Sequence, residues 1–110
     1  MSKVILVNTK TEHELASGQE AHIWWNHAAP ADAVWSANAV PLATGSTLTG
    51  FSQSTSLEVT RLWRKFIVTE KKPFPQSQTV ETTVEHEIHY VVKNVGNDKA
   101  RFVVFLSAVS

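Results

Sequence analysis

Alternation between hydrophobic and polar positions is clearest in the C-terminal half of the chain. Residues 57–69 and 79–93 are rich in Val, Ile, Thr and aromatic side chains, which is typical of β-strands. The Pro-containing segment 71–78 cannot continue either strand, so the two runs are predicted to form a long hairpin. A turn over residues 94–98 then leads to a last strand, Ala100–Val109. The sequence therefore predicts a three-stranded meander.

The same alternation assigns a core face and a second, mixed face to this meander. If the second turn is symmetric about Gly96, Tyr90 lies opposite Phe102 and the neighbouring residues pair in step. With matching parity in the first hairpin, Trp63 lies on the mixed face beside His89. The predicted core face comprises His86, Ile88, Tyr90, Val92, Ala100, Phe102, Val104 and Leu106, joined by Leu62, Phe66 and Val68. The mixed face comprises Arg61, Trp63, Lys65, Glu85, Glu87, His89, Val91, Arg101, Val103 and Phe105.

The N-terminal half begins with three shorter segments. Residues 4–7 are a β-branched run and are predicted to form an edge strand. Residues 9–19 are polar and are predicted to connect it to a second strand over residues 20–27.

The region that follows the second strand has no clear period. It could begin a short helix at Pro30 or a strand at Val34, and we favour an irregular connection that ends at Pro41. Residues 45–56 are crowded with Ser, Thr and Gly, and they are predicted to form a loop or an edge hairpin held by Phe51.

These elements define the expected fold class. A meander alone would leave apolar faces unpaired, and the strands upstream can cover them. We therefore expect an all-β protein, an antiparallel β-sandwich of immunoglobulin-like proportions, with a small closed β-barrel as the alternative. Residues 1–110 are expected to form a single β domain.

The adjacent residues Trp24 and Trp25 raise the question of function. Successive side chains of a strand point to opposite faces, so the two indoles cannot both enter one core. Trp25 groups with Ile23 and is assigned to the core, whereas Trp24 groups with the polar His22 and Asn26. Burying an indole is worth on the order of 4 kcal/mol. An outward-facing Trp24 is therefore expected to contact a ligand or a second subunit.

Composition narrows the possible partners and compartments. The chain has 110 residues, with 10 Lys and Arg balanced by 10 Asp and Glu, so net charge does not favour a polyanion partner. The basic and aromatic stretch 61–74 faces acidic residues of the same sheet, and nucleic acid is not expected to bind. There is no Cys, no signal peptide and no transmembrane segment. We expect a cytoplasmic protein, with non-classical export or association with a particle as alternatives.

Motifs for catalysis and metal binding are absent. The sequence lacks a Gly-x-Ser-x-Gly elbow, a phosphate-binding glycine loop and a His-Glu-x-x-His helix. Glu87 and His89 share one face, and a His from residues 21–27 could join them as a third metal ligand. Since no metal-binding spacing is present, we expect no metal and no cofactor.

The expected function is that of a small non-catalytic binding module of a lectin-like kind, which presents a Trp patch and acts as a homo-oligomer. One alternative is a structural subunit that uses its second apolar face as a protein interface. The other is a small enzyme that depends on His and Glu. The expected ligand is a carbohydrate or another small molecule. The candidate ligand-binding residues are His22, Trp24, Asn26, Arg61, Trp63, Glu87 and His89.

Overall fold

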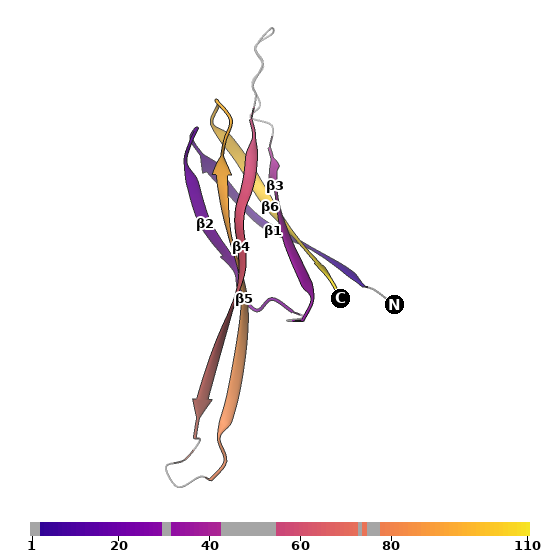
Figure 1. The fold of residues 1–110 in the computed structure, drawn as a ribbon, viewed down its shortest axis with the longest axis vertical. Coiled ribbons are helices and arrows are strands. Elements are labelled where there is room, and N and C mark those ends of the chain that lie inside the picture. Colours follow the sequence, from indigo (N-terminus) through magenta and orange to yellow (C-terminus); the bar gives the residue numbers. More distant parts are fainter. Residues whose placement is uncertain (1–2, 30–31, 43–54, 73, 75–77) are drawn as a thin grey trace.

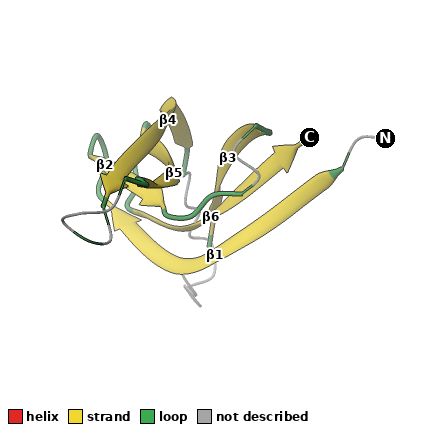
Figure 2. Ribbon diagram, turned by 90° about the horizontal axis from the view of Figure 1, so that it is seen from below, coloured by secondary structure: helices red, strands yellow, loops and turns green. Residues whose placement is uncertain are grey.

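The chain folds into strands and loops, as the colouring of Figure 2 shows. The computed structural model describes residues 3–29, 32–42, 55–72, 74 and 78–110. Within these ranges no helix is long and apolar enough to cross a membrane. The six strands are β1 (Val4–Leu15), β2 (Glu20–Trp25), β3 (Val34–Pro41), β4 (Leu57–Lys71), β5 (Glu81–Asn94) and β6 (Ala100–Val109).

The strands form two antiparallel sheets, each with three strands. One sheet has the order β1-β6-β3 and the other has the order β2-β5-β4. They pack face to face, so the predicted all-β antiparallel sandwich is confirmed, and the described strands do not close into a barrel (Figure 1). The predicted hairpin is also confirmed, because β4 pairs with β5 along almost its whole length.

The predicted pairing of the last two strands is wrong. β5 and β6 belong to different sheets, so Tyr90 and Phe102 are not cross-strand partners. The turn between them is an arch folded around the buried side chain of Asn94. Its Nδ2 donates to the carbonyl oxygens of Leu15 (3.0 Å) and Asp98 (2.8 Å), and its Oδ1 accepts from the Gly96 N–H (3.0 Å). The arch carries the chain from one layer to the other.

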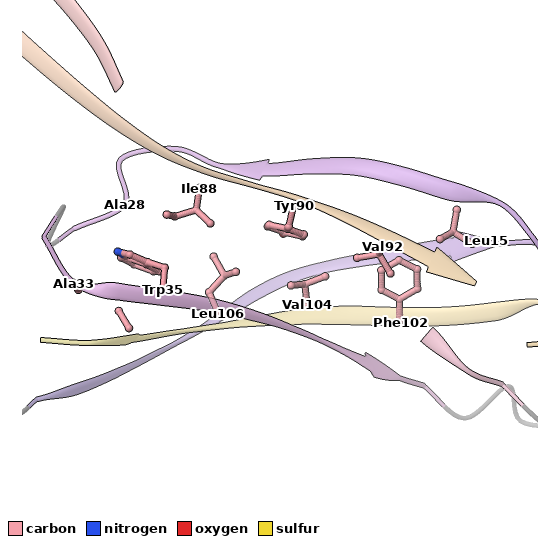
Figure 3. Packing of buried hydrophobic residues seen from close by; sticks show 11 residues of the cluster. Leu15, Ala28, Ala33, Trp35, Ile88, Tyr90, Val92, Phe102, Val104 and Leu106 are labelled. Atoms are coloured by element: carbon pink, nitrogen blue, oxygen red, sulfur yellow. The ribbon is translucent and has the colours of Figure 1, made fainter. Parts of the chain in front are cut away.

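The predicted core face is confirmed for β5 and β6, although its two strands lie opposite each other instead of side by side. An apolar face has the same period whether its neighbour pairs with it or packs against it. Figure 3 shows these side chains meeting between the two layers. The buried cluster comprises Leu15, Ala28, Ala33, Trp35, Ile88, Tyr90, Val92, Phe102, Val104, Leu106 and Ala108.

The prediction that Leu62, Phe66 and Val68 belong to the core is wrong. The register places them on the core-facing side of β4, yet they are 38%, 52% and 58% exposed. The far halves of β4 and β5 extend beyond the other strands (Figure 1), and the molecule is 72 Å long. We call residues 66–71 of β4 and 81–85 of β5 the arm. The opposite sheet does not cover its inner face.

His86 lies where the covered part of the hairpin meets the arm. Its Nδ1 donates to the Ala28 carbonyl (2.8 Å), and the Ala28 N–H donates to the His86 carbonyl (2.9 Å). Its ring stacks on Phe66 at 4.7 Å and meets the edge of Trp35 at 6.5 Å. Nε2 is buried with no hydrogen-bond partner in the described part of the chain. The side chain thus fastens the segment after β2 over the end of the core.

Two predictions for the N-terminal half are wrong. The polar residues after position 8 continue β1 to Leu15 across a bulge between Asn8 and Glu12, where Lys10 has a φ of 60°. A Thr9 hydroxyl bond to the Val104 carbonyl (2.8 Å) holds this bulge. Glu12 and its polar neighbours remain strand residues because one face of β1 is open to water.

The irregular connection expected before Pro41 is instead strand β3, which pairs with β6. Trp35 is buried, Ala37 and Ala39 pack against the core, and the residues between them are exposed. Alanine and asparagine are poor strand formers, so their low β-propensity obscured the alternation of buried and exposed residues in β3. The predicted strand over residues 20–27 ends earlier, at Trp25. Most of the loop predicted over residues 45–56 lies outside the described residues.

Candidate functional site

The outward face of the β2-β5-β4 sheet carries most of the candidate residues. In the strand register, Trp24 of β2 and Trp63 of β4 flank His89 of β5. The adjacent row places His22 and Arg61 on either side of Val91. Side chains two positions apart on a strand share a face, so these two rows form one continuous surface.

The first row is a stack of three nearly parallel rings. The ring centroids of Trp24 and His89 are 5.9 Å apart, with an interplanar angle of 19°. Those of Trp63 and His89 are 5.3 Å apart, at 22°. His22 tilts against both indoles, with centroids 5.5 Å from Trp24 and 5.0 Å from Trp63. We call His22, Trp24, Trp63 and His89 the indole platform.

A hydrogen-bond relay links the two histidines of the platform to the mostly buried Glu87. His89 Nε2 lies 2.9 Å from Glu87 Oε1, and His89 Nδ1 lies 2.8 Å from His22 Nε2. The side chains of His89 and Glu87 are only 8% and 15% exposed. Both nitrogens of His89 are therefore engaged, and the ring between the two indoles is fixed in place. His22 itself is exposed.

A β-bulge in β4 places Arg61 at the edge of the platform. Val59 pairs with Val92 and Arg61 pairs with Val91, so Thr60 is the extra residue. The bulge keeps Val59 and Leu62 on the core-facing side although they are an odd number of residues apart. It also puts the Arg61 guanidinium carbon 4.9 Å from the centroid of the Trp63 ring, which is a cation–π contact.

The structure therefore brings six of the seven candidate residues to one surface. The seventh, Asn26, is exposed in the bend after β2, and no contact links it to the platform. The two adjacent indoles divide as expected: Trp24 is 52% exposed, and Trp25 is partly buried against the core. Arg64 and Phe66 lie on the opposite face of β4, and Arg64 donates to the Ala33 carbonyl. The basic stretch of β4 is therefore split between two faces.

An open groove lies along the free edge of β2, beside the platform. It is lined by Ala21, His22, Ile23, Trp24 and, from β1, His13. The His13 ring stacks on Phe102 at 5.3 Å, and burial lowers the pKa of its imidazole below the ordinary value of 6.5. No pattern in the sequence pointed to His13, because its position depends on the extension of β1 past the bulge.

Metal binding and family membership add no further assignment. Within the ranges that the structure describes, no group of three or more His, Cys, Asp or Glu side chains could hold a metal ion. Comparisons with protein-family models, curated protein sequences and solved structures find no match to this chain. The geometry of the platform is therefore the basis for assigning its role.

Proposed function

We propose that this protein is a non-catalytic, lectin-like binding module that holds a carbohydrate on the indole platform. The observation that carries this proposal is the half-exposed Trp24, stacked on a His89 ring that the buried relay fixes from below. An exposed indole forgoes several kcal/mol of burial unless something covers it.

The platform suits the flat apolar side of a sugar ring. Trp24 and Trp63 stand two strand spacings apart, which is roughly 10 Å, so one ring or two linked rings can cover them. Exposed Arg61 adds hydrogen-bond donors at the margin, and exposed His22 adds a polar ring nitrogen. A ligand bound this way needs few polar contacts to fix its orientation.

The relay also bears on the enzyme alternative. Glu87, His89 and His22 have a geometry that can move a proton to the surface. Among the described residues, however, no hydroxyl is hydrogen-bonded to either ring, so no nucleophile is in place. The relay is better explained as the support that orients the platform.

The experiment is a titration with a panel of mono- and oligosaccharides, followed by tryptophan fluorescence. Trp24→Ala should weaken binding at least ten-fold. Phe74→Ala is the matched control, because Phe74 is also an exposed aromatic residue and follows the far end of β4 at Lys71, away from the platform. Binding that survives Trp24→Ala, or a panel with no binding sugar, would contradict the proposal.

A second candidate role, assembly with another copy of this chain, is favoured by the arm. Its inner face exposes Phe66, Val68 and Val84, and Phe74 and Val80 add apolar surface toward the tip. Together these side chains expose about 500 Å² of apolar surface, against the roughly 800 Å² that each partner buries in a standard interface. Contact between two arms, with their backbones included, would supply most of a dimer interface.

Analytical ultracentrifugation of three variants tests the assembly role. Val68→Asp, on the inner face of the arm, should shift the protein toward monomer. Thr69→Asp introduces the same charge on the outer face and should leave the association state unchanged. If Leu6→Asp, on the exposed outer face of β1, disrupts association instead, the interface lies on the other sheet. A wild-type chain that is monomeric at high concentration would contradict self-assembly.

A further inference from the structure

The relay beneath the platform has one consistent arrangement of protons when both rings are neutral. The Glu87 carboxylate can only accept, so His89 carries a proton on Nε2 and donates it. His89 Nδ1 is then an acceptor, and His22 must donate from its own Nε2. The remaining nitrogen, His22 Nδ1, has no partner among the described residues and is left as an acceptor on an exposed ring.

One additional proton can enter this relay at His22 Nδ1 without breaking a hydrogen bond. A second proton, on His89 Nδ1, would set two N–H groups against each other across 2.8 Å. The first proton places the charge on His22, 5.5 Å from Trp24 and 5.0 Å from Trp63. If the proton between the two rings shifts, the charge lies on His89 beside the Glu87 carboxylate. An indole face attracts a cation at such distances, and an anion bound at His22 Nδ1 would hold the charge on His22.

The protonated His22 would be the second cation on the same indole. The Arg61 guanidinium carbon lies 4.9 Å from the Trp63 centroid, and the His22 ring centroid lies 5.0 Å from it. Glu87, the carboxylate of the relay, is mostly buried and already accepts from His89. The exposed polar groups next to the indoles are therefore donors, and their complement is an anionic acceptor.

We propose that the platform selects carboxylate-bearing sugars, with the sugar ring on Trp24 and its carboxylate between His22 Nδ1 and the Arg61 guanidinium. This inference rests on the carbohydrate-binding function proposed above. Binding of the carboxylate takes up one proton at His22, so affinity rises as pH falls, by at most ten-fold for each pH unit.

Other charged groups lie near His22 and also influence how ligand affinity depends on pH. Across the sheet, Lys93 lies between Glu20 of β2 and Glu58 of β4, so this neighbouring row carries an excess of one negative charge. Lys65 lies opposite Glu87. From β1, His13 faces the groove, and burial lowers the pKa of its imidazole, which favours the neutral ring. The protonatable group closest to the proposed carboxylate is thus His22.

The test compares two ligands that differ only at the carboxylate, methyl β-glucuronide and methyl β-glucoside. Affinity is measured by tryptophan fluorescence and by saturation-transfer NMR between pH 8 and pH 5.5. The glucuronide should bind about ten-fold or more tightly than the glucoside at pH 6, because its carboxylate receives two charge-assisted hydrogen bonds. Its affinity should increase toward low pH, whereas that of the glucoside should stay level.

Two variants assign the effect to residues. His22→Gln keeps a donor toward His89 but cannot take up a proton, so it should abolish the pH dependence of glucuronide binding. Arg61→Gln should remove most of the preference for the glucuronide. Lys71→Gln is the matched control: it removes one positive charge from the outer face of the arm, far from the platform, and should change neither ligand's affinity.

The outcomes separate this inference from the function on which it rests. Equal binding of the two glycosides, lost in Trp24→Ala, would overturn the acidic-sugar inference and leave the lectin-like function standing. The same conclusion follows if Lys71→Gln weakens glucuronide binding as much as Arg61→Gln, because general charge would then explain the preference. If neither glycoside binds at any pH, the acidic-sugar inference is wrong, and the full saccharide panel decides whether the lectin-like function stands.

Discussion

The two halves of the β4–β5 hairpin share one pattern of side chains and differ in what covers them. Ile88 and Tyr90 are fully buried on the inner face of β5, whereas Val84, further along the same face, is 57% exposed. His86 stands between them with its ring against Phe66 and its Nδ1 bonded to Ala28. The covering β1-β6-β3 sheet accounts for the difference, because it lies over one half only.

This comparison shows where the stability of the fold resides. A two-stranded ribbon without a covering layer is marginal in water, and three strands or a packed layer are needed for independent stability. The covered half has both, since β2 adds a third strand from Lys93 to Ile88 and the second sheet packs on top. The arm therefore depends on the body of the molecule, while the body gains little from the arm.

The largest effect on stability is expected for a substitution in the covered half of the hairpin. Ile88→Ala should lower the free energy of unfolding by about 2–5 kcal/mol, because it leaves a cavity between the two sheets. Val84→Ala, on the exposed part of the same face, should cost about 0.5 kcal/mol or less. Urea denaturation at concentrations where the chain is monomeric measures both. Similar losses for the two variants would show that the arm is covered in solution.

A somewhat smaller effect is expected at the arch that places one sheet over the other. Asn94→Ala should lower the free energy of unfolding by about 2–4 kcal/mol, since two carbonyls and the Gly96 N–H lose their partner. Asn97→Ala is the control, because Asn97 lies in the same turn and is exposed. If Asn94→Ala melts like the control, the arch does not hold the layers together.

A third prediction uses the titration of a covered residue. Burial raises the pKa of Tyr90 to about 12, so the neutral phenol is the form that the fold favours. This stabilisation is complete below about pH 10 and is lost as pH rises from about 10 to 12, at a total on the order of 2–3 kcal/mol. Thermal melts of the wild type and of Tyr90→Phe should diverge over this range. Parallel curves would contradict a buried phenol.

The smallest effect is expected at His13, on the margin of the covered region. Burial lowers the pKa of its imidazole, so the folded state binds fewer protons than the unfolded chain. Stability should therefore fall as pH drops below about 6.5, and His13→Phe should remove this part of the acid sensitivity while keeping a ring against Phe102. Unfolding midpoints at pH 7 and pH 5 check the prediction. An equal shift in both proteins would rule out this role for His13.

The sequence was most informative about the faces of the strands. Alternation alone separated Trp24 from Trp25 and placed Trp63 beside His89, and both assignments agree with the register. Face and parity follow from the period of two, which each strand carries locally. The four candidate residues of β4 and β5 could therefore be assigned to one face, and the pairing of β2 with β5 was needed to add His22 and Trp24.

Alternation could not predict which strands pair or how far one sheet covers the other. β5 and β6 were expected side by side but pack in opposite layers, because an apolar face looks identical in either arrangement. The hydrogen-bond relay could not be predicted from the sequence either, since the 2.8 Å contact between His22 and His89 depends on the register of β2 against β5. Phe66 and Val68 show the same limit: alternation gives their direction and cannot say where the opposite sheet ends.

By itself, then, the sequence determined an all-β chain and the direction of the large side chains along each strand. The tertiary structure decided which strands are neighbours, how far one sheet covers the other, and that two histidines and a glutamate join beneath the indoles. The physical reason is the difference between local and long-range interactions. Side-chain direction is set residue by residue along a strand, whereas layering and hydrogen bonding between distant strands depend on turns, bulges and the packing of the whole core.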